Sequence, residues 1–156
     1  MRLPPFQKLI DAHGRDVHRF LIALVGHDGA DDCYQETWLA ALRAYPRLRD
    51  AANLRSWVLT IAHRKAIDHL RARNRVPALI GDQLPEPPAE PPPEPADESL
   101  WDLVRELPDK QRTALALRYV ADASYAEISA VMRTSQAAAR RSVHEGLKRL
   151  RTEYEQ

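Results

Sequence analysis

One segment of the sequence excludes regular secondary structure and thereby divides the chain. Residues 77–95 hold eight of the twelve prolines, with glutamates between them. Proline lacks the N–H that helices and sheets require, and the acidic side chains repel one another, so an extended or disordered segment is expected. The chain is therefore expected to form two small domains, residues 1–75 and 99–156, joined by an acidic Pro/Glu-rich linker at 76–98.

Apolar residues on both sides of this linker recur at helical spacing, and no stretch shows the alternation typical of strands. Three helices are expected before the linker, at about residues 6–25, 31–45 and 53–75. Gly26 and Gly29 are expected to end the first of them, and Gly14 to break or kink it. The fold class is therefore expected to be all-α.

The net charge of +1 hides an uneven distribution of charge. Residues 1–75 carry 13 basic and 8 acidic side chains, residues 76–98 carry no basic and 6 acidic ones, and residues 99–156 carry 10 and 8. Two basic domains around an acidic linker favour a polyanionic partner such as nucleic acid.

Several classes of protein are disfavoured by what the sequence lacks. Cys33 is the single cysteine, which leaves no disulfide framework and no cysteine-based metal site. No apolar run approaches a membrane span and no signal-peptide pattern heads the chain, so a protein of a reducing compartment, without membrane insertion, is expected. No metal-ligand spacing of histidines, nucleophile–base pattern or glycine-rich phosphate loop is present, so neither a cofactor nor enzymatic activity is expected.

Residues 31–38 place acidic and amide side chains on one helical face. Asp32, Gln35 and Glu36 share that face because they are three or four residues apart. Acids at a helix start suit the helix dipole, but no basic residue follows to pair with these until Arg43. This unpaired face is expected to bind a basic partner.

The helix expected at residues 53–75 has a basic face. Arg64, Asp68, Arg71 and Arg75 form a row at helical spacing, with Thr60 one turn earlier. Such a face can follow a phosphate backbone, although a solvated helix end favoured by the helix dipole is the alternative. The spacing of Trp57 indicates core packing rather than stacking on a base.

The C-terminal domain carries the pattern of a helix-turn-helix. A helix is expected from Pro108 to Val120, and residues 124–127 form a capping box that opens a short helix. Residues 132–134 are expected to form a tight turn before a last helix capped by Ser135 and running to about residue 154. Early polar residues of this last helix have the donors that read base edges: Gln136, Arg140, Arg141 and His144. A helical pair without a role in DNA binding is the alternative.

Together these blocks resemble a known family, the bacterial sigma factors of the extracytoplasmic-function (ECF) group. Residues 31–39 are similar to the stretch that opens region two of these proteins, and residues 54–64 and 67–71 look like the rest of that region. Residues 107–112 and 124–128 look like region four. The resemblance covers nearly the whole chain except the linker.

The resemblance implies three surfaces. A face that docks on core RNA polymerase is implied for Asp31, Asp32, Gln35, Glu36 and Arg43. Binding of the separated −10 promoter strand is implied for Arg49, Asp50, Asn53, Arg55, Ser56, Thr60, His63 and Arg64. Reading of the −35 element as duplex is implied for Arg133, Ser135, Gln136, Arg140, Arg141 and His144. An anti-sigma factor is a further expected partner, and the expected location is the bacterial cytoplasm.

The turn and the last helix depart from the family pattern. Arg133 stands where relatives commonly have Gly, and positive φ there would be mildly strained. Glu145 lies where a basic residue is common, and it either selects cytosine or repels phosphate. The alternative function is a stand-alone helix-turn-helix regulator that uses residues 1–75 as an interaction domain and needs no polymerase.

Overall fold

The computed structural model describes the backbone of residues 3–80 and 97–154, and the side chains of residues 3–73 and 100–154. These residues form helices and no strand, which confirms the all-α class. The elements are α1 (Phe6–Ala44), η1 (Tyr45–Arg47), α2 (Leu54–Ile80), α3 (Asp97–Arg105), α4 (Asp109–Tyr119), α5 (Tyr125–Met132) and α6 (Gln136–Tyr154). The prediction of an extended or disordered acidic segment falls mainly on residues outside these ranges.

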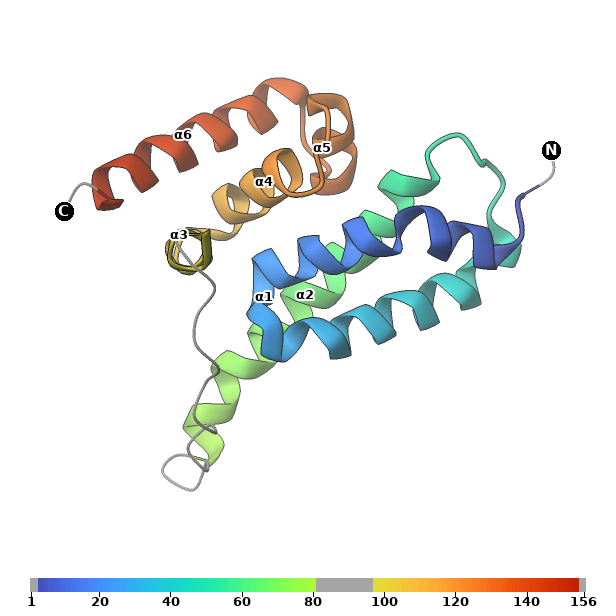
Figure 1. Cartoon of the computed structure of the whole chain (residues 1–156), viewed down its shortest axis with the longest axis horizontal. Coiled ribbons are helices and arrows are strands. Elements are labelled where there is room, and N and C mark those ends of the chain that lie inside the picture. The colour runs from blue at the N-terminus through green and yellow to red at the C-terminus, as the bar shows by residue number, and fades with distance from the viewer. Residues whose placement is uncertain (1–2, 81–96, 155–156) are drawn as a thin grey trace.

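The expected break in the first helical stretch lies at Gly26. Gly26 has φ 82° and ψ 171°, a backbone conformation that side chains disfavour, and it joins two helical halves of α1. The halves run back alongside each other (Figure 1), and Phe6 in the first half lies 5.8 Å, ring to ring, from Trp38 in the second. The second half therefore carries the face formed by Asp32, Gln35 and Glu36, here called the acidic face. Asp31 and Asp32 lie about one turn beyond the start of this half.

The predictions of breaks at Gly14 and Gly29 are wrong. Both residues lie inside helical stretches and are buried. A Cβ at Gly14 would lie 2.9 Å from the Tyr34 hydroxyl, and one at Gly29 would lie 2.4 Å from His69 Nε2. These glycines therefore permit close packing rather than a change of chain direction.

The helix α2 begins as expected but ends later. It continues to Ile80 and passes Pro77, where the sequence predicted an end near Arg75. Proline removes only its own N–H bond and distorts the preceding turn, so the remaining backbone bonds can carry a helix past it. Trp57 packs against the core, 6.1 Å ring to ring from Tyr45, which confirms its expected place.

The C-terminal half contains the expected helix-turn-helix and one helix that the sequence did not predict. The short helix α3 precedes the motif. The sequence did not predict it, because its acidic start at Asp97 and Glu98 continues the composition of the linker. Pro108 is the N-cap of α4 rather than its first helical residue. In α5 the capping box is present, with reciprocal bonds of 3.1 Å between Ser124 and Glu127.

The turn before α6 has the expected conformation and cap. Arg133 adopts the left-handed conformation, with φ 55° and ψ 50°. Ser135 Oγ accepts a hydrogen bond of 3.0 Å from the backbone N–H of Ala138, and α6 follows directly. The local sequence therefore specified both ends of this turn.

The two halves of the chain pack on each other (Figure 1). The helix α5 contacts α2, and α3 and α4 contact α1. One buried cluster runs through both halves, with Leu24 and Val58 from the N-terminal half and Leu117 and Ile128 from the C-terminal half. A second cluster around Leu115 lies within the C-terminal half. The two halves are thus joined by buried apolar contacts.

Candidate functional site

The acidic face lies on the second half of α1. The side chains of Asp32, Gln35 and Glu36 are exposed and make no hydrogen bond or ion pair with another described residue. Asp31 differs from the expectation, because its Oδ1 lies 3.0 Å from His18 Nε2. Its side chain is 81% exposed, so this pair is weak and leaves the carboxylate accessible. Arg43 is exposed in the last turn of the same helix.

Beside this face lies an apolar groove that the sequence did not reveal. It has a volume of about 360 Å³ and is lined by Phe6, Ile10, Tyr34, Gln35, Trp38, Leu39 and Leu42. Leu39 and Leu42 are each 52% exposed and lie together at this groove, so they form an apolar patch rather than isolated exposed leucines. The sequence placed these leucines on the side opposite the acids, but gave no sign that part of that side faces solvent.

Cys33 lies beneath the acidic face. It is fully buried, and burial raises the pKa of its thiol to about 11, with the Glu36 and Asp32 carboxylates adding to the rise. The cysteine is therefore a protonated core residue at neutral pH.

The residues implied in −10 binding divide into two groups. Arg49, Asp50 and Asn53 are exposed in or beside the loop before α2, where Asp50 Oδ1 accepts a bond of 2.9 Å from the Ala52 N–H. Arg64 is exposed farther along α2. The structure leaves these four side chains open to solvent.

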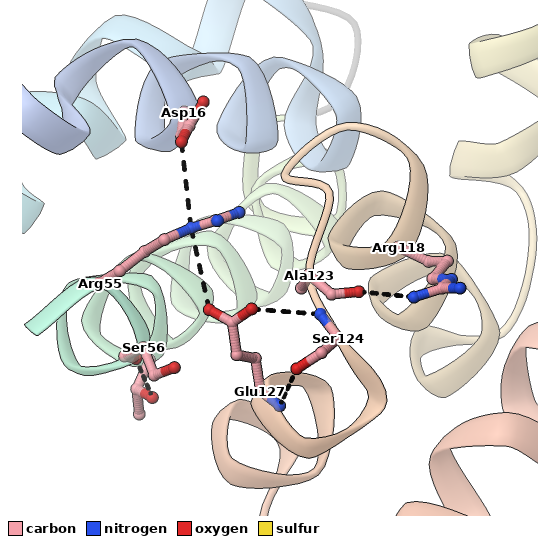
Figure 2. A network of polar contacts seen from close by, with 8 residues as sticks. Asp16, Arg55, Ser56, Arg118, Ala123, Ser124 and Glu127 are labelled. Atoms are coloured by element: carbon pink, nitrogen blue, oxygen red, sulfur yellow. Dashed lines mark hydrogen bonds and ion pairs between the residues drawn. The ribbon is translucent and has the colours of Figure 1, made fainter. Parts of the chain in front are cut away.

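The second group is partly or fully buried. Arg55 Nε is 3.9 Å from Asp16 Oδ2 on α1 and 3.9 Å from Glu127 Oε2 on α5 (Figure 2). Ser56 is buried, and its carbonyl accepts a 2.7 Å bond from the half-buried Thr60 hydroxyl. Arg55 therefore lies at the contact between the two halves, while Ser56 and Thr60 do not form an open face.

His63 also lies at this contact. Its Nε2 is 3.3 Å from the buried Thr113 hydroxyl on α4. Burial lowers the pKa of His63; Asp109 opposes this shift, while Arg112 and Arg64 add to it. The histidine is thus neutral at pH 7, and it lines an open pocket of about 410 Å³ between α2 and α4.

The residues implied in −35 reading form an open surface. Arg133, Ser135, Gln136, Arg140, Arg141 and His144 are all exposed along the turn and the start of α6. The Arg140 guanidinium carbon lies 5.0 Å from the centre of the Tyr125 ring, and that of Arg118 lies 4.5 Å from it. Sequence reasoning missed Tyr125 and Arg118, because their contact joins α4, α5 and α6 only in the fold.

Across residues 3–73 and 100–154, no group of three or more His, Cys, Asp or Glu side chains is arranged to hold a metal ion. None of the described helices is long and apolar enough to cross a membrane.

Comparison with known proteins identifies the family of both halves. Residues 9–76 match the Sigma-70 region 2 family and residues 97–150 the Sigma-70 region 4 family. The RNA polymerase sigma factor CarQ of Myxococcus xanthus is 32% identical over 94% of this chain and 87% of its own length. The ECF RNA polymerase sigma factor SigM of Bacillus subtilis is 30% identical, over 78% of each chain.

Solved structures show the same fold. The sigma factor RpoE of Bartonella quintana, in complex with the anti-sigma factor NepR, superposes with a TM-score of 0.78 at 22% identity over 94% of each chain. CnrH, in complex with the cytosolic domain of CnrY, gives a TM-score of 0.72 at 19% identity over 96% of this chain and 87% of that one. With both halves matched in order and relatives of 30% identity or more covered over most of their length, this chain belongs to the extracytoplasmic-function sigma factors, which direct RNA polymerase to specific promoters.

Proposed function

We propose that this sigma factor works through three surfaces: the acidic face of α1 for core polymerase, the start of α2 for the separated −10 strand, and α6 for the −35 duplex. The observation that carries the proposal is the acidic face, an exposed and unpaired set of polar side chains beside an apolar groove. A stand-alone regulator of duplex DNA has no need of such a face.

The chemistry of the α1 surface indicates its partner. Asp32 and Glu36 supply negative charge, while Leu39 and Leu42 supply exposed apolar area next to it. An apolar centre with a charged rim is typical of protein interfaces. The surface fits a helix that presents basic and apolar side chains, and we assign that helix to the polymerase.

The α6 surface suits duplex DNA. Arg140 and Arg141 are exposed in the second turn of the second helix of a helix-turn-helix, and Gln136 begins that helix. In this motif the early residues of the second helix enter the major groove, where arginine and glutamine donate to base edges.

The start of α2 suits a single strand. Arg49, Asn53 and Arg64 offer exposed donors to phosphates and unpaired bases. Strand separation is then favoured by holding unpaired bases on protein rather than by any chemical step. We therefore assign no enzymatic activity to the chain, and place its action in the bacterial cytoplasm with the polymerase.

An anti-sigma factor is a further proposed partner. RpoE was solved in complex with the anti-sigma factor NepR, and CnrH in complex with the cytosolic domain of CnrY. The exposed Leu39 and Leu42 offer this chain a surface that an inhibitor would have reason to cover.

Charge reversal on α1 tests the proposal. The double variant Asp32→Lys/Glu36→Lys should bind core polymerase at least about tenfold more weakly, because two attractions become repulsions. The matched control is Asp11→Lys/Glu106→Lys, which makes the same charge change at two exposed acids that are not part of the acidic face. Affinity is measured by fluorescence anisotropy of labelled sigma factor titrated with core enzyme.

The same proteins are then assayed for transcription from a promoter library with purified core enzyme. We expect promoter-dependent transcripts from the wild type and the control, and none from the Asp32→Lys/Glu36→Lys variant. Equal core affinity of variant and control would refute the assigned face. Tight duplex binding by a wild-type protein that gives no promoter-dependent transcript would instead support the stand-alone regulator.

A further inference from the structure

We propose that the pocket between α2 and α4, here called the α2–α4 pocket, binds a nucleoside monophosphate. The phosphate lies among Arg64, Arg71 and Lys110. The base lies on the apolar part of the lining, which Ile67 and Met132 form. This ligand is a free small molecule, and its binding needs neither promoter DNA nor polymerase.

The α2–α4 pocket has the size and composition of a small-ligand site. Its volume is about 410 Å³, and its lining comes from α2, α4 and the last residue of α5. Sites for small molecules in proteins enclose roughly 300–1,000 Å³ and combine apolar area with a few polar groups. One mononucleotide is a ligand of that size.

Positive charge dominates the lining of the α2–α4 pocket. Arg64 and Arg71 lie seven residues apart on α2, and Lys110 lies in the first turn of α4. All three side chains are exposed and make no hydrogen bond or ion pair with another described residue. Three cations without a partner thus line one pocket, which favours an anionic ligand.

The net charge of the lining matches one phosphate group. Two carboxylates line the pocket, but Asp109 is paired with Arg112, which leaves Asp68. His63 adds no charge at pH 7, because burial lowers its pKa. Three cations and one free carboxylate leave a net charge of +2, and a phosphate monoester carries about −1.5 to −2. The Asp68 carboxylate can accept a hydrogen bond from a sugar hydroxyl beside the phosphate.

The start of α4 adds backbone donors to these side chains. Its N-cap is Pro108, which makes no side-chain hydrogen bond to the first turn. The first N–H groups of a helix have no partner within that helix, and the helix dipole favours an anion beside them. Lys110 therefore stands next to backbone groups that also bind phosphate oxygens.

The remaining lining suits a base. Ile67 and Met132 are half-buried and contribute apolar surface, and methionine packs favourably against aromatic rings. In the same pocket His63 Nε2 and the Thr113 hydroxyl lie 3.3 Å apart and offer polar groups to the edge of a base. The α2–α4 pocket thus has groups for both ends of a nucleotide.

Occupancy of the pocket bears on the −10 strand through one side chain. Arg64 is proposed above to contact that strand, so a bound nucleotide and the strand use the same guanidinium. This consequence alone rests on the proposed function. Nucleotide binding is measured on the free protein, whereas promoter-dependent transcription tests the three surfaces, so the failure of either is recognised separately.

Arg71 and Lys110 allow the pocket to be tested outside the surfaces proposed for DNA and polymerase. Arg71→Gln and Lys110→Gln each remove one cation at an exposed position, where substitutions affect the fold little. Arg73→Gln is the control for the first, because side chains two residues apart on a helix do not face each other. Lys8→Gln is the control for the second, since both lysines are exposed in the first turn of a helix.

Isothermal titration calorimetry measures the binding of AMP, GMP, ribose 5-phosphate and inorganic phosphate to each full-length protein. We expect at least one nucleotide to bind the wild type at a single site. Arg71→Gln and Lys110→Gln should each weaken that binding about tenfold, through loss of one charge-assisted contact, and both controls should match the wild type. Ribose 5-phosphate and inorganic phosphate lack the base and should bind at least about tenfold more weakly.

Amide chemical shifts in NMR spectra of the wild type locate the bound nucleotide. The changes should concentrate at residues 63–71 and 109–113. Three results would each overturn the proposal: no saturable binding of either nucleotide, equal weakening by the variants and their controls, or shift changes centred on another surface. Inorganic phosphate that binds as tightly as the nucleotides would show an anion contact only and would refute a nucleotide site.

Discussion

Gly29 packs against His69, so the effect of Gly29→Ala on the free energy of unfolding should depend on whether the His69 imidazole is present. Gly29 is buried in the second half of α1, and an added Cβ would lie 2.4, 2.9 and 3.1 Å from three ring atoms of His69 on α2. Within a helix, replacing glycine by alanine alone stabilises by about 0.5–1 kcal/mol. Forcing a methyl group into an occupied site costs about 1–3 kcal/mol. Gly29→Ala should therefore destabilise the wild-type protein by about 1–2 kcal/mol.

Removing the imidazole should reverse that effect. In a His69→Ala background the added methyl group meets no ring, so Gly29→Ala should stabilise by about 0.5–1 kcal/mol. The coupling between the two positions is then about 2 kcal/mol, within the range for residues in direct contact. Four proteins suffice for this double-mutant cycle, and urea denaturation followed by far-UV circular dichroism measures each free energy of unfolding.

Gly14→Ala serves as the control. Its Cβ would lie 2.9 Å from the Tyr34 hydroxyl, the far end of a longer side chain that can move aside, so its cost should be below about 1 kcal/mol. The reasoning is refuted if Gly29→Ala stabilises the wild type as much as it stabilises the His69→Ala protein. In that case the imidazole moves aside without cost and does not determine how α1 lies on α2.

Four further predictions follow from single sites. Arg133→Gly should raise the free energy of unfolding by about 0.5–1 kcal/mol, because Arg133 has a φ of 55° that glycine adopts without strain; chemical denaturation measures it. The buried Cys33, whose pKa is raised to about 11, should react with a thiol reagent at pH 8 only as fast as the protein opens, which absorbance of the released product follows. The free energy of unfolding should fall as the pH drops below 6.5, because the pKa of His63 is lowered in the folded protein and the unfolded chain therefore binds the proton more tightly than the folded one. Urea midpoints at several pH values measure the fall. Tyr125→Leu should weaken −35 duplex binding about fivefold in a fluorescence anisotropy titration, because Arg140 loses the ring over which it lies.

Each of these four has an outcome that would contradict it. Equal stability of Arg133→Gly and wild type would mean that the turn is unstrained. Rapid labelling of Cys33 in the native protein would contradict its burial. His63→Gln should lessen the pH dependence, although His13, whose pKa is also lowered by burial, retains part of it; an unchanged slope would rule out His63. Tyr119→Leu, at a 57% exposed aromatic on α4, should leave duplex affinity unchanged.

Local chemistry made much of the fold predictable from the sequence. The capping box at Ser124 and Glu127, the cap at Ser135 and the helix break at Gly26 each depend on neighbouring residues, and all three appear in the structure. The predicted end of α2 near Arg75, ahead of Pro77, was wrong. Proline disfavours a helix without forbidding it, and α2 continues past Pro77.

Contacts between distant segments were not predictable. Nothing near Glu127 in the sequence indicates that one of its oxygens faces Arg55, and nothing near Gly29 indicates His69. The sequence grouped Arg55, Ser56 and His63 with Arg49 and Arg64 as one surface. The fold separates the two groups: Arg55 and His63 contact the C-terminal half and Ser56 is buried, while Arg49 and Arg64 stay exposed.

The buried cluster shared by the two halves affects how tightly the protein binds its partners. Leu117 and Ile128 are fully buried in the same cluster as Leu24 and Val58. Separating the halves exposes apolar surface, at about 25 cal/mol for each Å². A ligand that needs the halves apart therefore binds with an apparent affinity reduced by the small fraction of molecules that are open. A chain that is open about 1% of the time would bind such a ligand about a hundredfold more weakly than its open form does. The apolar contacts between the halves thus set a threshold concentration of partner below which this sigma factor stays unengaged.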